Sequence, residues 1–141
     1  MRLVLDSSVA FKWHIREVGS DQALRIRDDF LKGTAELLAP DVFPVEIAHS
    51  LTRAERQGRI TPAEGAIRMQ DALALLPYLH GYLKLLPRAY ELSSQTRQGV
   101  YDCLYVALAE REGCELITAD SRLIANLQAS FPFIRSLDSL P

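Results

Sequence analysis

The sequence LVLDSS at residues 3–8 decides the fold, because a short apolar run stops abruptly at an acid, Asp6. An unbroken apolar run of this length near the start of a chain is typical of a buried parallel strand, and it puts Asp6 at the carboxyl end of that strand. Open α/β sheets bind their ligands at this edge. We therefore expect later parts of the chain to bring further polar groups to the same edge.

The rest of the chain alternates strand-like and helix-like segments. Strands are predicted at residues 37–39, 82–86, 115–118 and 133–137, and helices at residues 8–13, 20–32, 44–57, 61–76, 87–96, 100–112 and 121–128. The clearest helix start is Thr61-Pro62-Ala63-Glu64, a capping box with proline at the first helical position. This alternation predicts a three-layer α/β/α sandwich with a central, mostly parallel sheet.

Length and composition fit one globular domain. The 141 residues contain no internal repeat or linker, so residues 1–141 are expected to form a single domain. No apolar run approaches the roughly 20 residues that cross a bilayer, and the first run is too short for a signal peptide, so we expect a cytoplasmic protein with no membrane contact. The two cysteines, Cys103 and Cys114, form neither a CxxC pair nor a disulfide framework.

The net charge of −2 argues against a broad basic surface. A protein that binds nucleic acid with this charge must use a local basic patch or a bound cation.

Four acids stand where a solvent-facing residue is not expected. Asp6 and Asp120 each follow a strand-like run, although either could simply cap the next helix. Asp102 is the only charge in the apolar segment 100–109, and its alternative role is also a helix cap. Glu46 lies in the first turn of its predicted helix, a position that the helix dipole alone favours.

Taken together, the four acids indicate a metal site. Carboxylates that converge on one sheet edge repel one another, and a hard divalent cation with oxygen ligands is the usual resolution. Mg²⁺ or Mn²⁺ is therefore the expected ion, and neither of these ions needs thiolate or imidazole ligands.

Four motifs, in this order, resemble the signatures of a PIN-domain ribonuclease, most closely the VapC-like toxin branch of type II toxin–antitoxin pairs. They are Leu5-Asp6-Ser7-Ser8, Phe43-Pro44-Val45-Glu46, the helix from Tyr101 to Glu110, and Leu116-Ile117-Thr118-Ala119-Asp120. The resemblance covers essentially the whole chain, and while each motif alone is unspecific, four in the right order are specific.

The resemblance implies that the catalytic and metal-binding acids are Asp6, Glu46, Asp102 and Asp120. It also implies that Ser7 and Thr118 hold the metal ligands in place without binding the ion themselves. No further acid follows Asp120 until Asp138, which leaves open whether one or two ions bind.

The activity that the resemblance implies is metal-dependent endoribonucleolytic hydrolysis of RNA, leaving a 5′-phosphate and a 3′-hydroxyl. The implied partners are the RNA substrate, a cognate VapB-like antitoxin and a second copy of the chain in a homodimer.

Several other residues suggest contact surfaces. A local basic rim could meet an RNA backbone, with a solvated helix face as the alternative; its members are Lys12, Arg53, Arg56, Arg59 and Arg68. Phe11 and Trp13, together with the helix face formed by Ala66, Ile67, Met69 and Leu73, suggest exposed apolar surface for a partner.

Two other classes of protein fit parts of this pattern. A receiver-type signalling domain needs a lysine after its last inner strand, and no lysine follows Lys84. A PIN-like protein that binds or processes RNA outside a toxin–antitoxin pair stays an open alternative, although loss of catalysis would be expected to show as missing acids.

Overall fold

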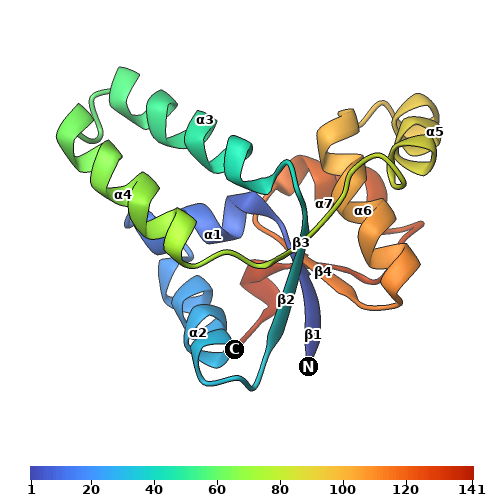
Figure 1. The fold of residues 1–141 in the computed structure, drawn as a ribbon. Helices are drawn as coiled ribbons and strands as arrows, with labels where there is room; N and C mark the ends of the chain where they lie inside the picture. The colour runs from blue at the N-terminus through green and yellow to red at the C-terminus, as the bar shows by residue number, and fades with distance from the viewer.

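Five parallel strands form one sheet at the centre of the protein, in the order β3-β2-β1-β4-β5 (Figure 1). The structure is a computed structural model that describes residues 1–141. Its strands are β1 (Arg2–Leu5), β2 (Glu36–Pro40), β3 (Tyr78–His80), β4 (Glu115–Thr118) and β5 (Ile134–Ser136). The sheet is therefore parallel throughout, which confirms the predicted α/β architecture.

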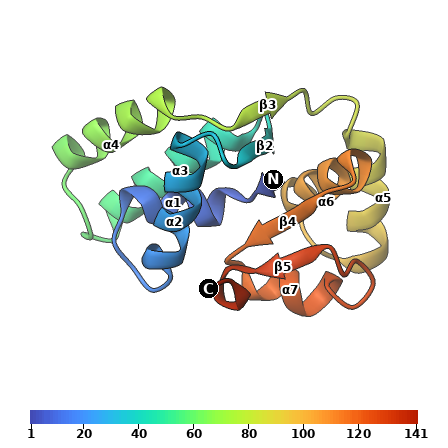
Figure 2. The same cartoon turned by 90° about the horizontal axis from the view of Figure 1, so that it is seen from below.

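Helices cover both faces of this sheet. They are α1 (Ser7–His14), α2 (Ser20–Leu31), α3 (Phe43–Arg56), α4 (Pro62–Ala74), α5 (Leu86–Thr96), α6 (Val100–Glu112) and α7 (Ser121–Leu127), and a short 3-10 helix, η1, spans Leu137–Ser139. Figure 2 shows α1 to α4 on one side of the strands and α5 to α7 on the other. Right-handed crossovers explain this division, because the chain moves outward from β1 to β3 and then returns across the sheet to β4 and β5.

The order of the strands creates one switch point, between β1 and β4. The chain leaves β1 toward one face and leaves β4 toward the other, so the two strand ends stay uncovered between their helices. Ligands of open α/β sheets bind at such a point. The fold thus places the residues that follow Leu5 and Thr118 next to each other.

The core explains why α6 is apolar on nearly every side. Residues Cys103 to Ala109 of this helix are all buried, and α6 packs against β1, β2 and β4 on one face and α5 on the other. Tyr105 is among the largest side chains with no exposed surface. No helix of the protein combines the length and the apolar character needed to cross a membrane.

Most predicted boundaries agree with the structure within one or two residues. The strand 115–118 and the helix 100–112 are confirmed with their predicted bounds, and α6 ends at Gly113, which adopts a left-handed φ of 64°. The capping box is also confirmed, since Thr61 Oγ1 accepts from Glu64 N at 3.1 Å and Glu64 Oε1 accepts from Thr61 N at 3.3 Å.

One predicted strand is wrong. Residues 82–86 form a turn and the start of α5, whereas the edge strand is Tyr78–His80. The side chain of Asp41 accepts a hydrogen bond from Tyr82 N at 3.1 Å and fixes this turn. Of this run, Leu85 is buried and Leu86 packs against the core at the start of α5, whereas Tyr82 and Leu83 are exposed.

The expectation that Phe11 and Trp13 are exposed is also wrong. Both side chains are only 8% exposed, and Trp13 Nε1 donates a hydrogen bond to the carbonyl of Ala23 in α2 at 2.8 Å. On α4, by contrast, Ile67 and Leu73 are exposed as expected.

The capping box gives a direct test of how the α3–α4 hairpin is held. Thr61→Ala removes the acceptor of Glu64 N, so we expect the free energy of unfolding in urea to fall by about 1 kcal/mol. Thr61→Ser keeps the hydroxyl and is the matched control, expected to unfold like the wild type. Equal stability of all three proteins would contradict the role given to this cap.

Candidate active site

The β1–β4 pairing places Asp6 beside Thr118. Asp6 N donates to the carbonyl of Ile117 at 3.0 Å, which continues the sheet one residue past β1. The Asp6 carboxylate is 4% exposed, and its Oδ2 accepts hydrogen bonds from Thr118 Oγ1 at 2.7 Å and from Ser8 Oγ at 2.8 Å. Asp6 precedes α1 but makes no side-chain cap bond, so the helix-cap alternative does not explain it.

Asp120 follows β4 and is tied to the same threonine. Asp120 N donates to Thr118 Oγ1 at 3.0 Å, so the Thr118 hydroxyl accepts from one acid's backbone while it donates to the other acid's carboxylate. Asp120 Oδ1 also caps α7, accepting from Arg122 N at 2.9 Å and Leu123 N at 3.3 Å. The cap is therefore real for one oxygen of Asp120.

Glu46 and Asp102 reach this edge from the first turns of α3 and α6. The phenol of the buried Tyr105 donates to Glu46 Oε1 at 2.6 Å, which ties α3 to α6. Gln98 Nε2 donates to Asp102 Oδ2 at 2.8 Å. Asp102 is not a cap, because Gly99 occupies that position.

Burial and repulsion from neighbouring carboxylates raise the pKa of Asp6, Glu46 and Asp102. Desolvation raises the pKa of Asp6 to about 6 against the opposing hydrogen bonds of Thr118 and Ser8, and the charges of Asp102 and Asp120 raise it further. Desolvation likewise raises the pKa of Glu46 to about 7, with Asp6 and Asp102 adding to the rise. The pKa of Asp102 is raised by burial and by Asp120. The four acids thus act on one another electrostatically.

The Ser7 hydroxyl lies in this same environment. It favours the ionised forms of both Glu46 and Tyr105 and so opposes the rise in the pKa of each. Ser7 also lines a pocket with Glu46.

Each of the four carboxylates has one oxygen held by a neutral donor and one that accepts no hydrogen bond. The held oxygens are Asp6 Oδ2, Glu46 Oε1, Asp102 Oδ2 and Asp120 Oδ1. None of the four acids forms an ion pair with a lysine, arginine or histidine, although such pairs are common elsewhere on the surface.

This donor set fits a hard divalent cation. The neutral hydrogen bonds orient the carboxylates without neutralising them, and a second sphere of that kind is what metal ligands require. As the side chains stand, no three of the protein's His, Cys, Asp and Glu groups are close enough to form a ready metal site.

Residues that sequence reasoning missed are the donors themselves: Ser8, Gln98 and Tyr105. Gln98 lies four residues before Asp102, and Asn126 Nδ2 in turn donates to Gln98 Oε1 at 2.8 Å, which fixes the amide orientation. The four-residue spacing of Gln98 and Asp102 could have indicated their hydrogen bond from the sequence. The Tyr105–Glu46 pair, 59 residues apart in the sequence, had no such signal.

Comparisons with known proteins all point to one family. The model of the PIN domain matches residues 3–127. The chain is 30% identical over 131 residues to Ribonuclease VapC3 of Pyrobaculum aerophilum, covering 92% of this chain and 97% of that protein.

Two solved structures share the fold. PAE2754 from Pyrobaculum aerophilum superposes with a TM-score of 0.69 at 18% identity, covering 99% of this chain and 94% of that one. VapBC2 from Rickettsia felis, solved bound to a DNA fragment from its promoter, superposes with a TM-score of 0.66 at 12% identity, covering 96% of this chain and 98% of that one.

The raised pKa of Asp6 predicts how metal-free stability depends on pH. Between the ordinary value of 3.8 and the folded pKa of about 6, the folded state binds more protons than the unfolded state, so stability falls as pH rises across this window. At pH 8 the charged carboxylate costs on the order of 3 kcal/mol, since the pKa rises from 3.8 to about 6. Asp6→Asn keeps an oxygen to accept from Thr118 and Ser8, and it should therefore be more stable than the wild type at pH 8 but not at pH 4 in chelator-treated samples.

Asp138→Asn is the matched control, because Asp138 is an exposed aspartate in η1. Its urea unfolding should follow the wild type at both pH values. A gain at pH 8 that is the same for Asp138→Asn and Asp6→Asn would show that overall charge, not the buried carboxylate, controls stability.

Proposed function

From the premise that this chain belongs to the PIN-domain family and, within it, to the VapC ribonucleases, we propose that it is a metal-dependent endoribonuclease that hydrolyses RNA phosphodiester bonds. The observation that carries the proposal is the edge of the sheet at the β1–β4 switch point. Carboxylates from four separate segments reach this edge, each with a free oxygen and none with a cationic partner.

We assign Asp6, Glu46, Asp102 and Asp120 as the catalytic metal ligands, with Mg²⁺ or Mn²⁺ as the ion. Held by these carboxylates, the ion would supply positive charge that admits an RNA phosphate to the acidic pocket and would activate water for attack on phosphorus. Without an ion, Glu46, whose pKa is about 7, is partly protonated at neutral pH, so binding of the ion would release protons.

The supporting residues hold these ligands in place. Thr118 and Ser8 fix the Asp6 carboxylate so that its Oδ2 faces the protein and its Oδ1 stays available. The Tyr105 phenol does the same for Glu46, because a pKa raised well above 10 keeps the phenol protonated and donating. Of the two supporting residues predicted from the sequence, Thr118 contacts Asp6 directly, while Ser7 acts on Glu46.

A covalent mechanism through a protein nucleophile is a poor fit. Burial raises the pKa of the Cys103 thiol to about 11, so this cysteine is not a thiolate at neutral pH. Hydrolysis by water is consistent with the products expected of this family, a 5′-phosphate and a 3′-hydroxyl.

The biological setting that we propose is a type II toxin–antitoxin pair in the cytoplasm, in which a VapB-like antitoxin restrains the ribonuclease and the chain forms a homodimer. We treat residues 1–141 as one nuclease domain, because its buried apolar residues form a single cluster. An RNA-processing enzyme outside such a pair would share the chemistry but would not arrest growth on induced expression.

Substitution of the acids tests the site. Asp6→Asn and Asp102→Asn each retain an acceptor for their neutral donors, so both should fold, yet each should lower kcat for RNA cleavage by roughly 100-fold or more. Circular dichroism checks the fold, and gel analysis of cleaved RNA checks the rate, with Asp138→Asn expected to cut like the wild type. Full activity of Asp6→Asn would refute the site assignment.

Thermal melting with added ion is the second test. Mg²⁺ or Mn²⁺ binds the folded state, so it should raise the Tm of the wild type, and the rise should be larger at pH 8 than at pH 5.5 because protons compete for Asp6 and Glu46. Asp6→Asn should show a smaller rise at pH 8. Equal shifts in the two proteins would place the ion elsewhere.

A further inference from the structure

We propose that Arg53 and Arg59 bind a backbone phosphate of the RNA strand next to the phosphate that is cut, in a basic pocket that opens beside the acidic edge. This inference deepens the proposed function and rests on it.

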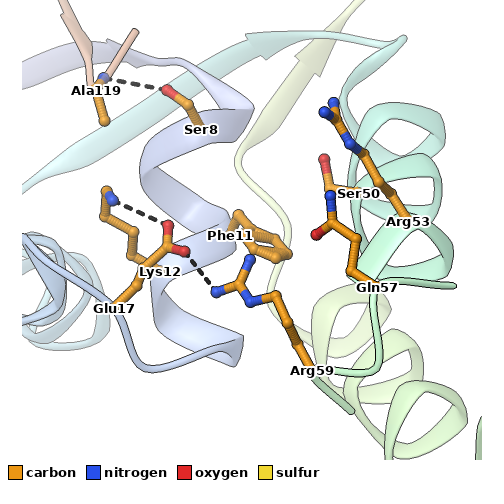
Figure 3. A pocket seen from close by; sticks show the side chains of 9 residues that line it. All are labelled: Ser8, Phe11, Lys12, Glu17, Ser50, Arg53, Gln57, Arg59 and Ala119. Atoms are coloured by element: carbon orange, nitrogen blue, oxygen red, sulfur yellow. Dashed lines mark hydrogen bonds and ion pairs between the residues drawn. The ribbon is translucent and has the colours of Figure 1, made fainter. Parts of the chain in front are cut away.

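The pocket lies between α1 and α3 and has a volume of about 360 Å³ (Figure 3). It is lined by Ser8, Phe11, Lys12, Glu17, Ser50, Arg53, Gln57, Arg59 and Ala119. Two of these residues also belong to the acidic edge: Ser8 Oγ donates to Asp6 and accepts from Ala119 N at 3.1 Å. The basic pocket therefore begins where the acidic site ends.

Helix periodicity explains why the two sites are continuous. Glu46, Ser50 and Arg53 on α3 and Gln57 at its C-cap are spaced by four, three and four residues, so they share one face. Arg53 lies about 10 Å along the axis from Glu46 at 1.5 Å per residue. Ser50 lines both this pocket and a neighbouring one that contains Glu46. One face of α3 thus runs from the acidic side chain of Glu46 to the basic side chain of Arg53.

The opposite wall has the same polarity. On α1, Ser8, Phe11 and Lys12 are spaced by three and one residues on one face, directly after Asp6. Both helices begin at an acid and carry a cation further along. The groove between them changes from negative to positive in one direction.

The cations of the pocket differ in their availability. Lys12 Nζ is committed to the protein, at 2.9 Å from Glu17 Oε1 and 2.7 Å from the carbonyl of Val18. Arg59 uses only Nη2, at 2.8 Å from Glu17 Oε2, and its guanidinium lies 5.7 Å from the centre of the Phe11 ring. Arg53 has no hydrogen bond or ion pair to any residue of the pocket (Figure 3).

Glu17 shows that this pocket already holds an anion. Burial is the largest single influence on the pKa of Glu17 and would raise it, but the hydrogen bonds and charges of Arg59 and Lys12 together outweigh burial and lower it. Lys12 and Arg59 contact this carboxylate, and Arg53 adds a third cation to the lining, so the pocket keeps a net positive charge for a further anion.

A phosphate of the substrate suits this place better than an acidic peptide. An arginine guanidinium offers a planar fork of donors that matches phosphate oxygens, and two such forks face the pocket. A strand cut at the acidic edge must continue in both directions from it. The exposed ring of Tyr101 lines the neighbouring Glu46 pocket and offers a surface on which a base can stack.

The structure also separates the members of the basic rim predicted from the sequence. Lys12, Arg53 and Arg59 line the pocket, whereas Arg68 on α4 pairs with Asp71 at 3.6 Å. Arg56 lies outside the pocket, although it shares the last turn of α3 with Arg53. Arg56 is therefore a matched control for Arg53, with the same helix, the same dipole environment and the same side chain.

The test measures binding of a short fluorescently labelled single-stranded RNA by anisotropy, with Mg²⁺ present, to the Asp6→Asn protein, in which cleavage is suppressed. Adding Arg53→Gln should weaken binding roughly 3- to 10-fold, as expected for one partly exposed ion pair with phosphate. It should also lower the slope of log affinity against log salt by about 0.7. Adding Arg56→Gln should change neither quantity.

Glu17→Gln should have the opposite effect on RNA binding. It releases Lys12 and Arg59 from a carboxylate, so RNA binding should tighten and its salt dependence should steepen. In a protein with the native Asp6, Arg53→Gln should raise KM for RNA more than it lowers kcat.

Equal losses in Arg53→Gln and Arg56→Gln, or unchanged RNA binding in both Arg53→Gln and Glu17→Gln, would overturn the proposal. Polyglutamate that displaces the RNA and loses affinity with Arg53→Gln as RNA does would also overturn it, by showing a site for acidic peptides. These outcomes are separate from failure of the proposed function, which would appear as absence of cleavage by the wild type.

Discussion

The hydrogen bond from the Thr118 hydroxyl to the buried carboxylate of Asp6 is the interaction on which the site depends. It joins the ends of β1 and β4 across the switch point, and its geometry follows from the register that pairs Leu5 with Ile117. Burying a carboxylate costs several kcal/mol when nothing compensates it. Thr118 and Ser8 offset this cost only with neutral hydrogen bonds, so burial still raises the pKa of Asp6 to about 6. Because no protein cation neutralises the ionised carboxylate, its charge stays available to a metal ion.

The positions of the acids at helix starts explain how the protein tolerates four of them. Asp6 and Asp120 directly precede α1 and α7, while Glu46 and Asp102 lie in the first turns of α3 and α6. A helix N-terminus carries a partial positive charge, which stabilises a nearby carboxylate by some tenths of a kcal/mol to about 1 kcal/mol. Four helix starts therefore share one edge of the sheet with four acids, and the fold offsets part of the repulsion before any ion binds.

The sequence was informative where a local pattern and its tertiary environment agree. Strand-length apolar runs ending at Asp6 and near Asp120 indicated both the parallel sheet and its functional edge. The same reasoning failed at residues 82–86, because an apolar run of that length can equally seat a helix start on a core, and the Asp41 side chain that fixes the preceding turn is about 40 residues away.

The packing contacts of individual side chains could not be derived from the sequence in the same way. Periodicity placed Phe11 and Trp13 on a helix but did not show that α2 covers Trp13 or that Arg59 lies over Phe11. Nor did it show that Tyr105 reaches Glu46 from the middle of an apolar helix. These contacts depend on how helices pack, which a single sequence does not specify residue by residue. What separates Arg53 from Arg56 is likewise only the face of α3 on which each lies.

The alternation of charge along the α1–α3 groove bears on how a polyanion could reach an acidic site in a protein with net charge −2. Without a cation, the carboxylates repel phosphate, and attraction must come from charges a short distance away. The basic pocket lies at that distance, with Glu17 restraining Lys12 and Arg59 but leaving Arg53 free. A strand held there by a flanking phosphate gains proximity to the acidic edge, and the repulsion that remains is confined to the one phosphate that must meet the metal ion. Separation of the attracting and reacting charges along one groove between the same pair of helices thus allows a ribonuclease of this family to work without a broad basic surface.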